Sequence, residues 1–176
     1  MKRLAFAFVS AMLMAVVVSA APISLAVGSA AVDGLVSQGE YANFTTLSGI
    51  GFGATLSDDG SLITLAIQAP TSGWVAIGLG AGIMDGAWML LAYDADGKPA
   101  YSEQLGAGHF HQAVKASKIL KSQVKAVGGS TVLEIQVKGS DFIKDGTLPV
   151  ILAYGKNPDF TSKHVRYAKT SLVLAQ

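Results

Sequence analysis

Residues 73–94 constrain the fold more than any other segment, because two apolar runs flank a glycine-rich loop. In residues 74–79 both alternating sets of side chains are largely apolar, which predicts a strand covered on both faces. A second apolar run, residues 87–93, follows the loop and predicts a neighbouring strand. Gly80 and Gly82 permit tight turns or the close approach of a flat ligand. The sequence therefore predicts strand, loop and strand here.

Short apolar or alternating segments, separated by turn signals such as Asp58-Asp59-Gly60, continue along the rest of the chain. No long stretch has the 3.6-residue period of a helix, although a helix within residues 114–121 stays open. One short helical turn capped by Ser140 is expected in residues 139–145. This pattern predicts an all-β fold, a two-sheet immunoglobulin-like antiparallel β-sandwich. The other expected strands are residues 40–47, 50–57, 61–69, 98–103, 122–127, 131–138, 148–154 and 165–174, with a loop at 104–112.

The N-terminus predicts a secretory signal peptide, residues 1–20. It begins Met1-Lys2-Arg3, continues with an apolar run and ends in the small residues Ser19 and Ala20. Cleavage after Ala21 or Ala26 is an alternative. A membrane anchor is less favoured, because the run is short for a span of about 20 residues. The expected product is secreted or periplasmic, with residues 21–31 as a leader and residues 32–176 as one domain.

Composition excludes several functions. The chain has no cysteine, so disulfides, iron–sulfur clusters and covalent attachment of haem are excluded. Without Lys2 and Arg3 it carries 11 basic and 12 acidic residues and no charge run, so no nucleic-acid partner is expected. No second long apolar stretch follows the signal peptide, so no membrane span is expected in the mature chain. Hydrolase and nucleotide-binding motifs are absent, so the chain is not expected to be an enzyme.

The segment Gly-Trp-x-Ala-x-Gly at residues 73–78, followed by Met84 and Gly86-Ala87, resembles the DOMON domain family. Its haem-binding branch includes the cytochrome domain of cellobiose dehydrogenase. The resemblance implies a β-sandwich that binds haem b or a sugar. In the haem-binding branch a methionine of this loop and a histidine near the C-terminus ligate the iron, and the matching residues are Met84 and His164. The implied function is an exported b-type cytochrome that passes single electrons to a separate redox partner.

Haem needs apolar walls and a partner for its propionates. The wall residues expected from the sequence are small or aromatic, and Arg166 or Lys163 is the expected propionate partner through a charge-assisted bond. His164 with Met84 would fill both axial positions and leave outer-sphere electron transfer as the chemistry. The predicted wall residues are Gly80, Ala81, Gly82 and Ile83 on one face and Tyr154, Phe160 and Tyr167 on the other, and Trp74 is a further residue expected to bind the cofactor.

Other interpretations stay open. Lys163 competes as an axial ligand, because some haem proteins of related fold use lysine. His109 and His111, two residues apart, can chelate copper or zinc if the segment is extended, or one of them replaces His164. A carbohydrate-binding or other ligand-binding module without haem is the alternative function. It is less favoured, because Trp74 lies in an apolar strand and is expected to be buried rather than exposed as a sugar platform.

Overall fold

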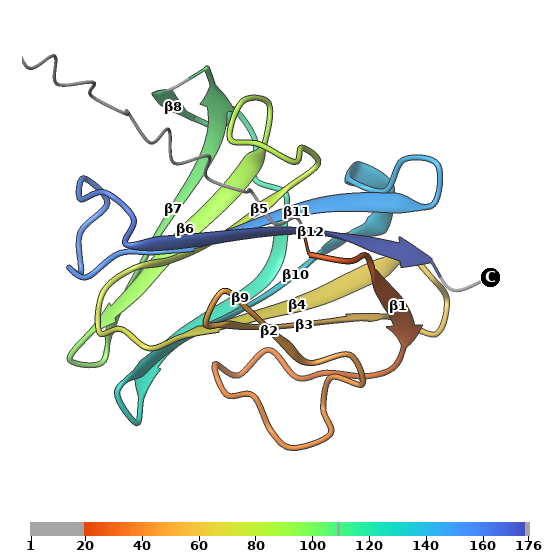
Figure 1. The fold of residues 1–176 in the computed structure, drawn as a ribbon, viewed down its shortest axis with the longest axis horizontal. Coiled ribbons are helices and arrows are strands. Elements are labelled where there is room, and N and C mark those ends of the chain that lie inside the picture. The colour runs from red at the N-terminus through yellow and green to blue at the C-terminus, as the bar shows by residue number, and fades with distance from the viewer. Residues whose placement is uncertain (1–19, 109, 175–176) are drawn as a thin grey trace, which may run out of the picture.

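A computed structural model describes residues 20–108 and 110–174 and has two β-sheets that share one strand (Figure 1). The predicted all-β sandwich is confirmed, since every regular element of the described residues is a strand except one 3-10 turn. Sheet A has the order β8-β7-β6-β5-β11-β12-β1, and sheet B continues β1-β3-β4-β10-β9 with β2 beside β3. The strands are β1 (Ile23–Val27), β2 (Thr45–Leu47), β3 (Ile50–Leu56), β4 (Leu62–Ala69), β5 (Val75–Leu79), β6 (Trp88–Ala95), β7 (Lys98–Ala107), β8 (Phe110–Ala113), β9 (Ile119–Val127), β10 (Ser130–Lys138), β11 (Thr147–Tyr154) and β12 (Arg166–Leu174).

The first described strand differs from the expectation of a leader at residues 21–31. β1 pairs in parallel with β12 through Ile23 and Leu25, and then in parallel with β3 through Ala26 and Val27. The sandwich is thus antiparallel except at β1. Sequence pattern alone did not find this strand, because its pairing partners lie at the far end of the chain and in β3. Residues 1–19, most of the predicted signal peptide, lie outside the described residues.

Because β1 joins both sheets, its buried side chain should contribute to folding. Leu25 is 2% exposed and belongs to the core, whereas Val27 in the same strand is 60% exposed. Leu25→Ala is expected to lower the free energy of unfolding by about 2–5 kcal/mol, through lost burial and the cavity left behind. Val27→Ala, the matched control, should change it by about 0.5 kcal/mol or less. Urea unfolding measures both, and equal small effects would show that β1 does not stabilise the domain.

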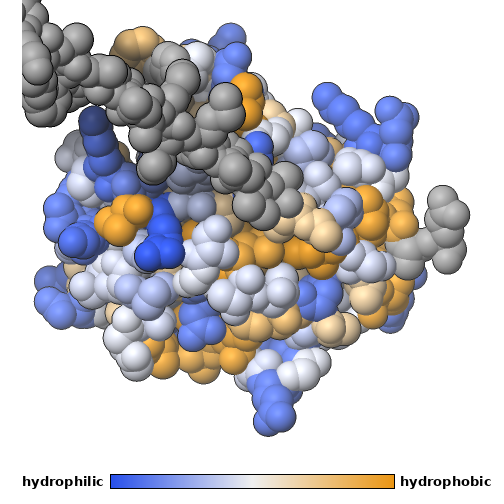
Figure 2. Space-filling model, in the orientation of Figure 1, coloured by the Kyte–Doolittle hydropathy of each residue, from blue (hydrophilic) through white to orange (hydrophobic). Residues whose placement is uncertain are grey.

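The main core lies between the two sheets and follows the two-residue period of the strands. Sheet A contributes Val75, Ile77 and Leu90, and sheet B contributes Leu65 and Leu133, all at most 1% exposed. The outer face of sheet A carries a second, smaller cluster, described below. In the view of Figure 2, hydrophobic residues form a band across the middle of the molecule and hydrophilic residues gather at its margins. Every residue of β5 is buried, which agrees with the apolar side chains that the sequence places on both of its faces.

Three local expectations are corrected. The expected loop at residues 104–112 is largely strand, because β7 extends to Ala107 and turns into β8, which pairs back onto it. Residues 114–121 contain no helix, and Ile119 begins β9. A 3-10 turn does occur at Gly139–Asp141, but its N-cap is Lys138 and no side chain caps it, so Ser140 lacks the predicted role.

Within residues 20–108 and 110–174, no helix has the length and apolar character needed to cross a bilayer.

Candidate functional site

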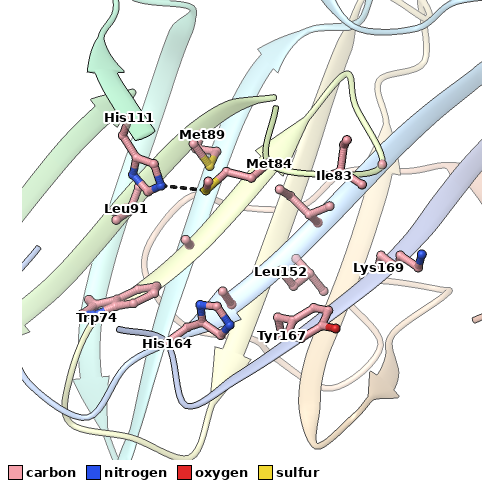
Figure 3. A pocket seen from close by; sticks show the side chains of 15 residues that line it. Trp74, Ile83, Met84, Met89, Leu91, His111, Leu152, His164, Tyr167 and Lys169 are labelled. Carbon is pink, nitrogen blue, oxygen red and sulfur yellow. Dashed lines mark hydrogen bonds between the residues drawn. The ribbon is translucent and has the colours of Figure 1, made fainter. Parts of the chain in front are cut away.

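A cavity of about 420 Å³ lies on the outer face of sheet A, over β5, β6, β11 and β12 (Figure 3). Alternation along the strands makes its floor, since the residues between those of the main core point outward. Trp74, Ala76 and Leu91 belong to this outward cluster, and Ala153 packs against it. The small side chains of Ala76 and Ala153 leave open space above the strands. The cavity lining is Trp74, Ala76, Gly78, Gly82, Ile83, Met84, Met89, Leu91, His111, Ile151, Leu152, Ala153, His164, Tyr167 and Lys169.

Met84 enters the cavity from the loop between β5 and β6, and backbone hydrogen bonds fix this loop. The amide of Ala87 donates to the carbonyl oxygen of Met84 at 3.0 Å. The amide of Gly86 donates to the carbonyl of Gly106 at 3.0 Å, and the amide of Gly106 donates to the carbonyl of Ala87 at 2.9 Å. Strand β7 therefore holds the loop in place, and the thioether of Met84 is half-buried among cavity residues.

His111 reaches the same cavity from β8. Its Nε2 lies 2.9 Å from Sδ of Met84, and its Nδ1 lies 2.5 Å from Oε1 of Gln104 on β7 (Figure 3). The corrected β7–β8 hairpin explains this placement, because pairing of β8 with the end of β7 brings His111 beside Gly106. His109 lies outside the described residues.

His164 lies on the other side of the cavity, next to Tyr167 (Figure 3). The two rings meet edge to face with centroids 5.5 Å apart. The loop before them is anchored twice: Nε1 of Trp74 donates to Oγ of Ser162 at 3.0 Å, and the amide of Val165 donates to the carbonyl of Tyr154 at 2.7 Å. His164 itself is exposed, so it is held by its backbone and its aromatic neighbour rather than by burial.

The structure brings together six of the eleven residues predicted for the site, which share one cavity although they come from distant segments. The other five do not line the cavity. Tyr154 points into the main core and Gly80 lines a second cavity. Phe160 packs against the outer cluster, beside Tyr93, with the two rings tilted at 46° and their centroids 4.9 Å apart. Arg166 is exposed and absent from the cavity lining. The six are Trp74, Gly82, Ile83, Met84, His164 and Tyr167.

Sequence reasoning missed Lys169, Met89 and Leu91. The two-residue period of a strand was the signal that could have found them. Lys169 follows Tyr167 by two positions in β12 and shares its face, whereas Arg166 belongs to the opposite set. Leu91 and Met89 alternate in the same way along β6.

The arrangement fits a flat apolar group that carries a metal better than it fits a metal ion alone held by hard ligands. Among the described residues, no group of three or more His, Asp or Glu side chains could hold a metal ion. Haem supplies four ring nitrogens of its own and needs only axial ligands from the protein. The cavity offers two thioethers, two imidazoles and an apolar floor, so its residues fit haem.

Solved structures similar to this chain include cytochrome domains and carbohydrate-binding modules. Cytochrome domain structures similar to this chain include that of Myriococcum thermophilum cellobiose dehydrogenase, with 16% identity over 73% of this chain and 77% of that one (TM-score 0.55). Another is the cytochrome b domain of pyranose dehydrogenase from Coprinopsis cinerea, with 15% identity over 69% of this chain and 75% of that one (TM-score 0.53).

A carbohydrate-binding module of family 9 from Caldicellulosiruptor kristjanssonii, in complex with cellotriose, is also similar. It has 11% identity over 87% of this chain and 93% of that one, with a TM-score of 0.57. No protein-family model matches the sequence, and no curated protein matches it. At these identities the likeness concerns the fold, so the chain has the sandwich shared by cytochrome b domains and family 9 modules.

Proposed function

We propose that this chain is an exported b-type cytochrome domain that binds haem b non-covalently, with Met84 and His164 as axial ligands. The observation that carries the proposal is the cavity itself. Met84 and His164 line it from opposite sides, across a floor of small and apolar residues (Figure 3). The fold, which cytochrome b domains share, is compatible with this function.

Haem, when bound, supplies an iron centre that gains and loses one electron. The chain's own residues set its surroundings. The thioether of Met84 would be a soft ligand that favours ferrous iron, and the imidazole of His164 would supply a nitrogen ligand. Trp74 and Leu91, both at most 6% exposed, exclude water from the floor. With both axial positions filled, the proposed role is one-electron transfer to a separate redox protein.

Lys169 is our proposed partner for a haem propionate, in place of Arg166 or Lys163. It lines the cavity and is half-buried, whereas the other two are exposed and do not line it. An ammonium group at a partly dry rim forms a charge-assisted hydrogen bond with a carboxylate. Lys163 is correspondingly not proposed as an axial ligand.

The test is an absorption spectrum of the purified chain loaded with haem, oxidised and reduced. We expect sharp low-spin bands on reduction. Met84→Leu and His164→Ala should each remove them and weaken haem binding by about tenfold or more. His111→Ala is the matched control, because it removes a histidine from the same cavity and should leave the bands in place.

Two results would contradict the proposal. If the bands were lost in His111→Ala and retained in His164→Ala, the nitrogen ligand would be His111 and not the proposed His164. A colourless chain that binds cellotriose would favour the carbohydrate-binding alternative. The structure offers that alternative little support, because Trp74 and Trp88 are buried at 6% and 4% exposure and neither presents a platform for a sugar.

A further inference from the structure

The contact between Met84 and His111 is not used by the proposed haem site. Nε2 of His111 lies 2.9 Å from Sδ of Met84, and Figure 3 shows the two side chains directed at each other. They come from different elements, the β5–β6 loop and β8, so local geometry does not force them together. This pair needs its own explanation.

The hydrogen bonds around His111 define its free nitrogen. Nε2 of Gln104 donates to Oγ of Ser102 at 2.8 Å, which directs Oε1 of Gln104 toward the imidazole. That oxygen only accepts, so Nδ1 of His111, 2.5 Å away, is the donor of this hydrogen bond. In the tautomer that has its proton on Nδ1, Nε2 presents a lone pair to the sulfur of Met84, which is also an acceptor. Two electron-pair donors therefore converge with no hydrogen between them.

A cation bound between the two atoms satisfies both lone pairs. Metal-binding histidines characteristically donate their other ring N–H to an oxygen acceptor, as His111 does to Gln104. A thioether selects soft ions such as Cu(I), and an imidazole also suits copper. Met89, whose thioether lines the same cavity in the cluster against which Met84 packs, is available as a third ligand.

We propose that Met84 and His111 form a Cu(I) site at the rim of the cavity. It goes beyond the haem proposal and does not depend on it, since His164 takes no part. Met84 is shared, so a chain that holds haem through Met84 cannot hold copper there, and the two occupants exclude each other. Failure of copper binding would leave the haem proposal standing, because the spectrum of His164→Ala tests that separately.

The test is competition for Cu(I), kept reduced, between the purified haem-free chain and a chromophoric Cu(I) chelator. We expect one Cu(I) per chain. Met84→Leu, which nearly conserves volume, and His111→Ala should each weaken binding by about tenfold or more. Gln112→Ala is the matched control. Gln112 neighbours His111 in β8, is exposed and does not line this cavity, so its loss should leave copper binding unchanged.

X-ray absorption of the copper-loaded chain supplies a second readout. We expect sulfur and nitrogen scattering from the metal, with sulfur reduced in Met84→Leu. Copper binding of wild-type strength in both Met84→Leu and His111→Ala would overturn the proposal. Unchanged sulfur scattering from copper in Met84→Leu would also overturn it, because the thioether of Met84 would then not be a ligand.

Discussion

Glu134→Ala is expected to lower the free energy of unfolding by about 3–5 kcal/mol. Glu134 is fully buried on β10 and accepts three hydrogen bonds. The hydroxyl of Tyr41 donates to Oε1 at 2.6 Å, and the amides of Asp33 and Gly34 donate to Oε2 at 2.9 and 2.8 Å. Alanine would leave all three donors without partners, and each buried one costs about 1–3 kcal/mol. Urea unfolding measures the loss.

Glu134→Gln is the control for shape, and it also tests a pH dependence. Burial raises the pKa of Glu134 above its ordinary 4.5, although the hydrogen bonds from Tyr41, Asp33 and Gly34 oppose the shift. Between the ordinary and the raised pKa the folded chain binds more protons than the unfolded chain, so stability should fall as pH rises through that window. The glutamine variant should lack this fall. An equal fall in both proteins would show that another group titrates.

Gly106→Ala should have the largest effect on the site itself. A β-carbon at Gly106 would lie 1.8 Å from the carbonyl oxygen of Met84, far inside van der Waals contact, so the Met84 loop would have to move. The move would break the hydrogen bonds that tie Gly86 and Ala87 to Gly106. We expect a loss of about 3 kcal/mol in stability. We also expect loss of the low-spin haem bands, measured by urea unfolding and absorption.

Gly82→Ala is the matched control for folding. A β-carbon at Gly82 would meet no atom within 4 Å, and its φ is not in the left-handed region. Alanine there should leave the free energy of unfolding unchanged or raise it by about 1 kcal/mol or less. If Gly106→Ala behaved like Gly82→Ala, the loop would be free to shift without cost, and the fixed position of Met84 would be refuted.

Much of the fold could be predicted because most strands have a recognisable pattern within their own residues. Apolar alternation and turn signals located β3, β4, β5, β10 and β11 to within one or two residues. They failed at β1 and β8, which are short and are defined by their pairing partners rather than by their own pattern. The alternation of β10 also misled at Glu134. Its face is polar in sequence, yet the segment carrying Tyr41 covers it.

The residues of the candidate site were also predicted only in part. Sequence pattern with the family resemblance selected Met84, His164 and Trp74, which the structure brings to one cavity. It also selected Tyr154 and Arg166, which belong to the opposite faces of their strands. The choice between neighbouring positions depends on register, and register depends on which strands pair. The contact of His111 with Met84 requires the β7–β8 hairpin, which lies where the sequence pattern predicts a loop.

By itself, the sequence determined the class of fold and the chemistry available to it: short alternating strands, no thiol, and a few soft or imidazole ligands. Only the tertiary structure decided which of those ligands meet, because Met84, His111 and His164 come from three separate segments. Local pattern reports which face of a strand is apolar. It does not report which distant strand lies alongside, since that is set by packing of the two sheets and by the pairing of β1 with both.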